Sequence, residues 1–191
     1  MKEETQPSDQ ELVTHALRDK RTFAVIVRRY EDRLMRYVRR LGCRDRRAAE
    51  DILQEIFIKV YIHLNDYDPS LAFSSWLYRI AHNETVSFFR KEKVRPRVVE
   101  AEEDLVIFEN IVGDTDIAGQ VDREHAAERI REAVGLLEPK YRDVFILKYF
   151  EEKSYEEISD ILELPPGTVA TLISRGKRKL RNALEKYRQH P

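Results

Sequence analysis

The stretch that decides the fold is Ser154–Arg181, SYEEISDILELPPGTVATLISRGKRKLR. It predicts two short helices joined by a tight turn that contains proline. The second helix has an apolar stripe whose members recur every three or four residues: Val169, Leu172, Ile173, Gly176, Leu180, Leu184 and Tyr187. Its other side is polar and basic, with Thr171, Ser174, Arg175, Lys177, Arg178 and Arg181.

A helix that buries one face and presents short polar and cationic side chains outward suits the major groove of DNA. The pair of helices therefore predicts a helix-turn-helix. Residues near the start of the second helix are expected to face base edges, and these are Thr168, Ala170, Thr171 and Ser174. The cations beyond them are expected to hold phosphates: Arg175, Lys177, Arg178 and Arg181. The alternative is a helical hairpin whose basic face is only solvated.

Composition sets the class of protein. The chain has 191 residues, of which 36% are charged and 42% hydrophobic, enough for one large domain or two small ones. No apolar run approaches the roughly 18–20 residues that span a bilayer, and the first ten residues lack the apolar core of a secretory signal. The single cysteine, Cys43, excludes an internal disulfide and a cysteine-rich zinc site. These features indicate a cytoplasmic protein.

Charge is segregated along the chain, although the net charge is only −1. Residues 98–124 carry nine acidic residues and one basic residue, whereas residues 165–191 carry seven basic residues and one acidic residue. The acidic segment lacks a helical period, so we interpret residues 94–124 as a flexible linker. The apolar residues inside it, between Leu105 and Val112, either dock on a neighbouring domain or bind a partner.

Helical periodicity predicts an all-α chain with two small domains, at residues 8–93 and 125–188. In the first domain, Ser8 and Glu11 form a capping box ahead of a short helix, a stripe from Phe23 to Leu41 closes at Gly42, and Asp45 caps the next helix. Its last helix, at about 74–90, is expected to bury Leu77, Ile80 and Ala81. In the second domain we expect helices at about 123–137 and at 141–150, behind Pro139, and then the helix-turn-helix, opened by a capping box of Ser154 and Glu157.

The sequence contains few signs of an enzyme active site. Carboxylates cluster at Glu50, Asp51 and Glu55, but none of the five histidines completes the Glu-x-x-His pairs of a di-iron bundle. The sequence also lacks a glycine-rich phosphate loop and a nucleophile elbow. We interpret the acids as a solvated helix face that binds protein, and we expect no enzyme, no cofactor and no metal.

A second candidate for nucleic-acid binding is Phe73–Lys93, FSSWLYRIAHNETVSFFRKEK. It mixes polar side chains with aromatic rings and ends in basic residues. Unpaired bases stack on aromatic rings while cations hold their backbone, so this stretch suits single-stranded DNA. The alternative for Trp76, Phe88 and Phe89 is ordinary core packing.

Taken together, these pieces resemble the extracytoplasmic-function sigma factors, a compact group within the sigma-70 family of bacterial RNA polymerase subunits. The resemblance covers about residues 8–188. It rests on five stretches that occur in the expected order: the entry helix at Phe23–Tyr30, AAEDILQEIFIKVY at 48–61, FSSWLYRIAHN at 73–83, LEPKYRDVFILKYFEEKSYEEISDIL at 137–162 and GTV at 167–169.

The resemblance implies a sigma factor that binds core RNA polymerase and directs promoter-specific initiation in response to an extracytoplasmic stress. The first domain would bind the polymerase clamp through Glu50, Asp51, Gln54, Glu55 and Ile58. It would melt the −10 element through Trp76, Arg79, His82, Asn83, Arg90, Lys91 and Lys93. The second domain would read the −35 element as duplex DNA. The resemblance also implies an anti-sigma factor, often membrane-bound, as a partner.

Some positions depart from the family pattern. The family often has lysine and arginine at the positions of Ala170 and Leu172, glycine at that of Glu163 and aspartate at that of Ser87. We therefore expect −35 binding to depend more on Arg175, Lys177 and Arg178. Two other functions stay open at this point: a stand-alone helix-turn-helix regulator that binds a palindrome as a dimer, and an enzyme built on the first domain with a DNA-binding tail.

Overall fold

The computed structural model describes residues 7–92, 134 and 137–189, with side chains in the last helix described as far as Asn182. The described residues form helices and no strands, which confirms the all-α prediction, and they fall into two units. Some predictions concern parts of the chain outside the described residues. These are the linker at 94–124, most of the helix at 123–137, Lys93, and the side chains of Leu184 and Tyr187.

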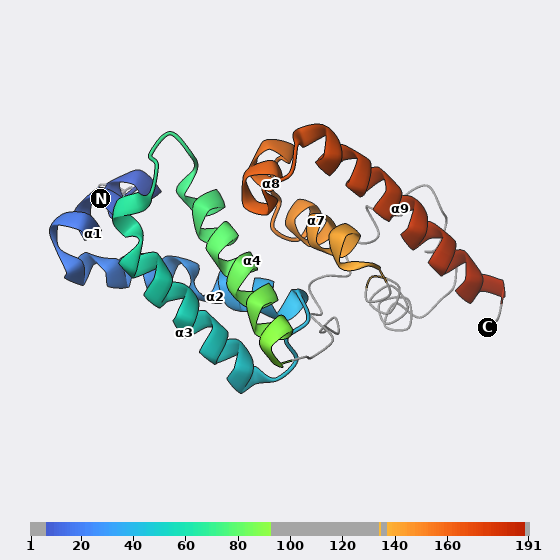
Figure 1. Ribbon diagram of the computed structural model, residues 1–191, viewed down its shortest axis with the longest axis horizontal. Helices are drawn as coiled ribbons and strands as arrows, with labels where there is room; N and C mark the ends of the chain where they lie inside the picture. The colour runs from blue at the N-terminus through green and yellow to red at the C-terminus, as the bar shows by residue number, and fades with distance from the viewer. Residues whose placement is uncertain (1–6, 93–133, 135–136, 190–191) are drawn as a thin grey trace, which may run out of the picture. The chain divides into compact units, whose positions relative to one another are not determined.

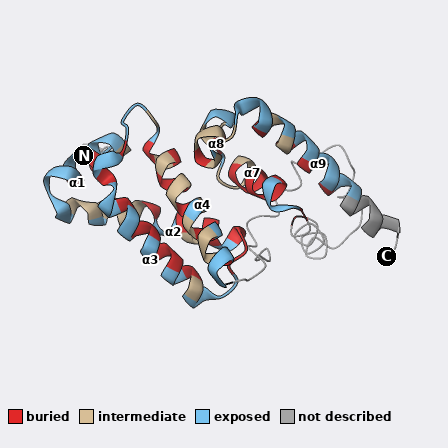
Figure 2. Cartoon of the chain, in the orientation of Figure 1, coloured by how far each residue is buried: buried red, intermediate tan, exposed pale blue. Residues whose placement is uncertain are grey.

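The first unit contains the helices α1 (Asp9–Arg18), α2 (Phe23–Arg40), α3 (Arg46–Ile62) and α4 (Phe73–Glu92). Two short 3₁₀ turns, η1 (Lys20–Thr22) and η2 (Leu64–Asp66), connect them. The helix α3 packs against α4, and α1 lies against η1, η2 and α4 (Figure 1). The core is apolar and fully enclosed, with Ile26, Leu34, Ile56, Leu77 and Ala81 (Figure 2). Ile80, predicted to be buried, is only half-buried.

Helix starts follow the predicted caps. The Ser8 hydroxyl accepts from the backbone N–H of Glu11, whose carboxylate accepts from the Ser8 N–H in return. The Asp45 carboxylate accepts from the backbone N–H groups of Arg47 and Ala48, at the start of α3. Because these caps satisfy donors that the helix itself leaves unpaired, they set where α1 and α3 begin.

A polar cluster holds α1 on the bundle. The Asp9 carboxylate accepts hydrogen bonds from the Tyr30 hydroxyl and, at 2.8 Å, from Nη1 of Arg29. Burial, together with the bond to Asp9, raises the pKa of Tyr30 far above its ordinary value. Beside this cluster, the Gln10 side-chain amide donates to the Pro69 carbonyl at 3.2 Å. The helix α1 therefore holds the loop that leads into α4, a contact that the sequence pattern did not indicate.

The second unit contains α7 (Pro139–Tyr149), α8 (Tyr155–Leu162) and α9 (Pro166–Gln189). Both α7 and α8 pack against α9, and the capping box of Ser154 and Glu157 opens α8 as predicted. The predicted stripe of α9 is buried at Val169, Ile173, Gly176 and Leu180, but Leu172 is only half-buried (Figure 2). The helix-turn-helix interpretation is thus confirmed in its fold.

The turn between α8 and α9 stores backbone strain at Glu163. This residue caps α8 in the left-handed conformation, with φ 54° and ψ 43°. A left-handed residue with a Cβ costs roughly 1–2 kcal/mol, which glycine avoids at some cost in unfolded-state entropy. We therefore expect Glu163→Gly to stabilise the second unit by about 0.5–1 kcal/mol.

Native-state hydrogen exchange of the α8 and α9 amides measures this effect. A matched control is Glu156→Gly, because Glu156 is also exposed but lies within α8. There the glycine should destabilise the unit by about 1 kcal/mol. Equal destabilisation by both substitutions would contradict the assignment of strain to Glu163.

Candidate functional site

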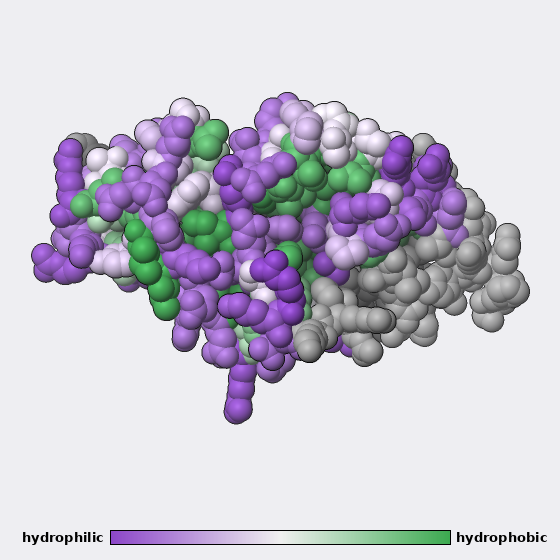
Figure 3. Space-filling view, in the orientation of Figure 1, coloured by the Kyte–Doolittle hydropathy of each residue, from purple (hydrophilic) through white to green (hydrophobic). Residues whose placement is uncertain are grey.

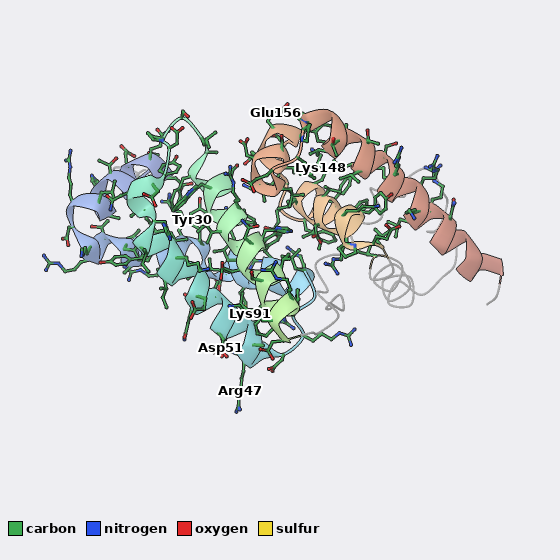
Figure 4. All side chains as sticks on the ribbon, viewed as in Figure 1. Tyr30, Arg47, Asp51, Lys91, Lys148 and Glu156 are labelled. Carbon is green, nitrogen blue, oxygen red and sulfur yellow. The ribbon has the colours of Figure 1, made fainter. Side chains whose placement is uncertain are left out.

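The outward face of α3 carries all five residues predicted to bind polymerase. Glu50, Asp51, Gln54, Glu55 and Ile58 are exposed, whereas the opposite face is buried in the core. Figure 4 shows Asp51 and Arg47 pointing away from the bundle at the start of α3. The face is acidic towards the N-terminal end of the helix and apolar towards its C-terminal end, where Figure 3 shows a green ridge along α3.

The apolar end of this face is larger than predicted. The side chain of Ile58 is 49% exposed and that of Ile62, one turn further on, is 61% exposed. Tyr61 is also exposed, with its ring edge-on to Phe23 at a centroid distance of 5.2 Å. The sequence signal for Ile62 is its spacing of four residues from Ile58, since this places both on the same side of the helix. We call Ile58, Tyr61 and Ile62 the apolar ridge.

Most acidic side chains at the N-terminal end of this face form no ion pair with the described residues. Arg46 contacts Glu50 at 2.9 Å, but both side chains are exposed, and such a pair contributes little to stability. Lys59 turns to the other side, where its ammonium lies 2.5 Å from the Glu84 carboxylate and links α3 to α4. Among the residues that the structure describes, Asp51 and Glu55 have no ion pair. Their charges therefore remain available to a basic partner.

A helical stripe on α4 brings together part of the predicted −10 site. Trp76, Arg79, Asn83 and Arg90 recur at three-, four- and seven-residue steps, so they share a side of the helix. Asn83 and Arg90 are exposed, and Arg79 is half-buried. Within the described residues Arg90 has no ion pair, and its guanidinium donates to the Ser87 hydroxyl at 3.2 Å.

The remaining predicted residues of this site differ in setting. His82 is half-buried, and Lys91 is exposed at the C-terminal end of α4 (Figure 4). Trp76 is half-buried, and its ring centroid lies 5.6 Å from that of Tyr67 and 5.8 Å from that of Phe73. One side of the Trp76 ring therefore packs against the core, as the alternative interpretation predicted. Phe89 is buried and Phe88 half-buried.

Hydrogen bonds shape the loop before α4. The Tyr67 hydroxyl donates to the Leu71 carbonyl at 2.6 Å, and the Ser70 backbone N–H donates to the Asp68 carboxylate at 2.9 Å. The bond from Ser70 lowers the pKa of Asp68, whereas burial raises the pKa of Tyr67. This loop enters α4 next to the aromatic cluster of Tyr67, Phe73 and Trp76, so it fixes where the stripe on α4 begins.

The outward face of α9 matches the predicted duplex-reading face. Thr168, Thr171 and Ser174 are exposed, and Ala170 is half-buried. The four predicted phosphate-binding cations are exposed as well: Arg175, Lys177, Arg178 and Arg181. The structure therefore gathers all eight predicted residues on the part of α9 that the core does not use.

The lysines of α9 differ from its arginines. The Lys177 ammonium lies 5.3 Å from the ring centroid of Tyr149, and Lys179 lies 3.0 Å from the Glu138 carboxylate. Hydrogen bonds from Lys179 and then Lys140 lower the pKa of Glu138. Both lysines thus interact with their own unit. Within the described part of the chain, Arg175, Arg178 and Arg181 have no ion pair.

Both units of the chain match family models of known proteins. Residues 26–95 match the family model "Sigma-70 region 2", and residues 127–180 match "Sigma-70, region 4". The chain is 39% identical over 171 residues to "ECF RNA polymerase sigma factor SigW" of Bacillus subtilis, which covers 87% of this chain and 90% of SigW. The chain belongs to the ECF sigma factors of the sigma-70 family. It is an RNA polymerase sigma factor that directs promoter-specific transcription initiation.

Two solved structures share the fold of this chain. The structure of CnrH in complex with the cytosolic domain of CnrY matches with a TM-score of 0.69 and 22% identity, over 94% of this chain and 99% of that one. The sigma factor RpoE of Bartonella quintana, in complex with the anti-sigma factor NepR, matches with a TM-score of 0.61 and 20% identity, over 85% and 96%. No helix in the described residues has both the length and the apolar character to cross a membrane.

Proposed function

We propose that three outward faces divide the work of this sigma factor. The face of α3 binds core RNA polymerase, the stripe on α4 holds the −10 strand and the face of α9 reads the −35 duplex. The domains responsible are residues 8–93 and 125–188, joined by a linker at 94–124. The observation that carries the proposal is the apolar ridge on α3, because large exposed apolar side chains beside unpaired acids suit a protein partner better than solvent.

The chemistry of α4 suits a separated strand rather than a duplex. Asn83 offers hydrogen bonds to base edges, and Arg90 and Lys91 place positive charge at the end of the helix for the strand's backbone. The half-buried ring of Trp76 provides one flat surface at the start of the stripe. We infer that melted −10 DNA runs along α4 from Trp76 towards Lys91, with Lys93 beyond.

Regulation and location complete the proposal. We propose that the chain acts in the cytoplasm, has no catalytic activity of its own, and is held inactive by an anti-sigma factor until an extracytoplasmic stress releases it. Support comes from the family, whose members are not enzymes, and from RpoE of Bartonella quintana, solved in complex with an anti-sigma factor. The exposed face of α3 that binds polymerase would then be available to the inhibitor.

Permanganate footprinting of promoter complexes tests the role of α4. Holoenzyme reconstituted from this chain and core polymerase should make −10 thymines reactive. We expect Arg90→Glu with Lys91→Glu to reduce that reactivity at least about fivefold, because two phosphate-binding charges become repulsive. Binding to core polymerase should not change.

A matched control is Arg21→Glu, since the Arg21 side chain is 93% exposed on η1 and lies outside α4. It should leave the permanganate signal intact. Unchanged reactivity in the α4 double variant, with normal core binding, would contradict the assignment of α4 to the −10 strand.

A further inference from the structure

The start of α9 is unusual in its chemistry. From Pro166 to Ser174 it contains no charged residue and no side-chain amide, and Ser154–Ser174 as a whole contains no basic residue. The first cation of the reading face is Arg175. A Cβ placed on Gly167 would meet no atom within 4 Å, so this end of the helix is open to an approaching surface.

The outward groups at this end are small: the methyl groups of Thr168, Ala170 and Thr171, and the hydroxyls of Thr168 and Ser174. Thr168 and Thr171 are exposed and Ala170 is half-buried. The Thr171 hydroxyl donates to the Gly167 carbonyl at 2.8 Å, within the helix. Because its proton is used there, Thr171 presents its methyl group and an acceptor oxygen to the outside. We call Thr168, Ala170 and Thr171 the methyl edge.

Major-groove chemistry limits what the methyl edge can read. Guanine is read by arginine or lysine, adenine by asparagine or glutamine, and cytosine by an acidic side chain, whereas serine and threonine hydroxyls bond to more than one base and so discriminate less. The start of α9 has none of these side chains. Alanine and the threonine methyl group instead pack against the C5-methyl group of thymine, which is the one apolar feature of the major groove.

We propose that the methyl edge selects the −35 element by van der Waals contact with thymine C5-methyl groups. This inference rests on the proposed role of α9 in reading the −35 duplex. Phosphate binding does not explain the edge, because the edge carries no charge and α8 beside it adds the acids Glu156 and Asp160. The division within α9 is then clear: thymine is read at the start, and phosphates are held from Arg175 onward.

Deoxyuridine tests the proposal directly, because it differs from thymidine only by the C5-methyl group. The −35 sequence is first selected from a randomised promoter library with reconstituted holoenzyme. Each thymine of the selected element is then replaced by deoxyuridine, and holoenzyme binding is measured by competition. One lost methyl contact should weaken binding about fourfold at the contacted positions. The same replacement in the spacer should have no effect.

Two substitutions of Thr171 assign the contact. Thr171→Ser keeps the hydroxyl but removes the methyl group. At the one thymine that Thr171 contacts, holoenzyme with this variant should therefore bind the thymidine and deoxyuridine promoters equally. Thr171→Val keeps a methyl group in the same place and removes the hydroxyl, so it should retain the wild-type discrimination at that position. A structural effect of the residue would instead change the binding of both promoters together.

The outcomes separate this inference from the proposed function. If selection yields no thymine in the −35 element, or if wild-type holoenzyme binds both promoters equally while still requiring the −35 sequence, thymine readout is wrong and duplex reading by α9 stands. If binding does not depend on the −35 sequence at all, the proposed role of α9 fails as well. Discrimination that is lost in Thr171→Ser and kept in Thr171→Val supports the inference.

Discussion

Ile58→Asp is expected to lower the affinity of the chain for core RNA polymerase by at least about tenfold. Fully burying an exposed isoleucine side chain contributes roughly 1.5–3 kcal/mol, and about half of this applies to Ile58, which is 49% exposed; burying an unpaired carboxylate adds a further cost. Since about 1.4 kcal/mol corresponds to a factor of ten in affinity, the change should be large. Folding should be affected much less than polymerase binding, because about half of Ile58 is exposed in the free chain.

Fluorescence titration of labelled chain with core polymerase measures this affinity. A matched control is Leu17→Asp on α1, because Leu17 belongs to the same unit and is 48% exposed. The control variant should bind polymerase as the unchanged chain does. Normal binding by Ile58→Asp, or an equal loss in both variants, would contradict the assignment of the apolar ridge to the polymerase interface.

Arg175→Ala with Arg178→Ala is expected to weaken holoenzyme binding to −35 promoters by about tenfold or more at physiological salt. Both side chains are exposed, and neither has an ion pair within the described residues. Because Ala170 and Leu172 carry no charge, few other cations on this face can replace them. The slope of log affinity against log salt should fall by about two, since two phosphate contacts are removed.

Lys179→Ala provides the matched control for the arginines. It also removes one positive charge from α9, but the Lys179 ammonium is held 3.0 Å from Glu138 and 5.1 Å from the ring centroid of Tyr141. Its loss should therefore leave the salt slope nearly unchanged. Should Lys179→Ala lower the slope as much as an arginine substitution does, net charge rather than the position of each cation would govern binding.

Local signals in the sequence were sufficient for the helices. The capping boxes at Ser8 and Ser154 lie where α1 and α8 begin, because a capping box involves only residues three apart. The buried stripes of α3 and α9 follow for the same reason, since helical periodicity depends on neighbours in the chain. The resemblance to sigma factors then placed the outward residues of α3, which the structure shows to be exposed.

Contacts between distant residues could not be predicted in this way. The Asp9 cluster joins residues about twenty positions apart, and Lys59 reaches Glu84 on the next helix. Neither pairing leaves a periodic signal. Ile62 was not predicted because helical periodicity identifies only the apolar residues of the buried stripe, and Ile62 lies outside that stripe. The contact between Lys177 and Tyr149 was not predicted because it depends on how α9 packs against α7.

Run-off transcription with purified core polymerase tests the central claim most directly. The template is a promoter selected by the holoenzyme, and the compared proteins are the unchanged chain, Ile58→Asp, and Arg175→Ala with Arg178→Ala. We predict a specific transcript only when core polymerase and the unchanged chain are both present. The first variant should lose the transcript through failed assembly and the second through failed promoter binding. A transcript of equal yield from core polymerase alone, or from both variants, would contradict the account.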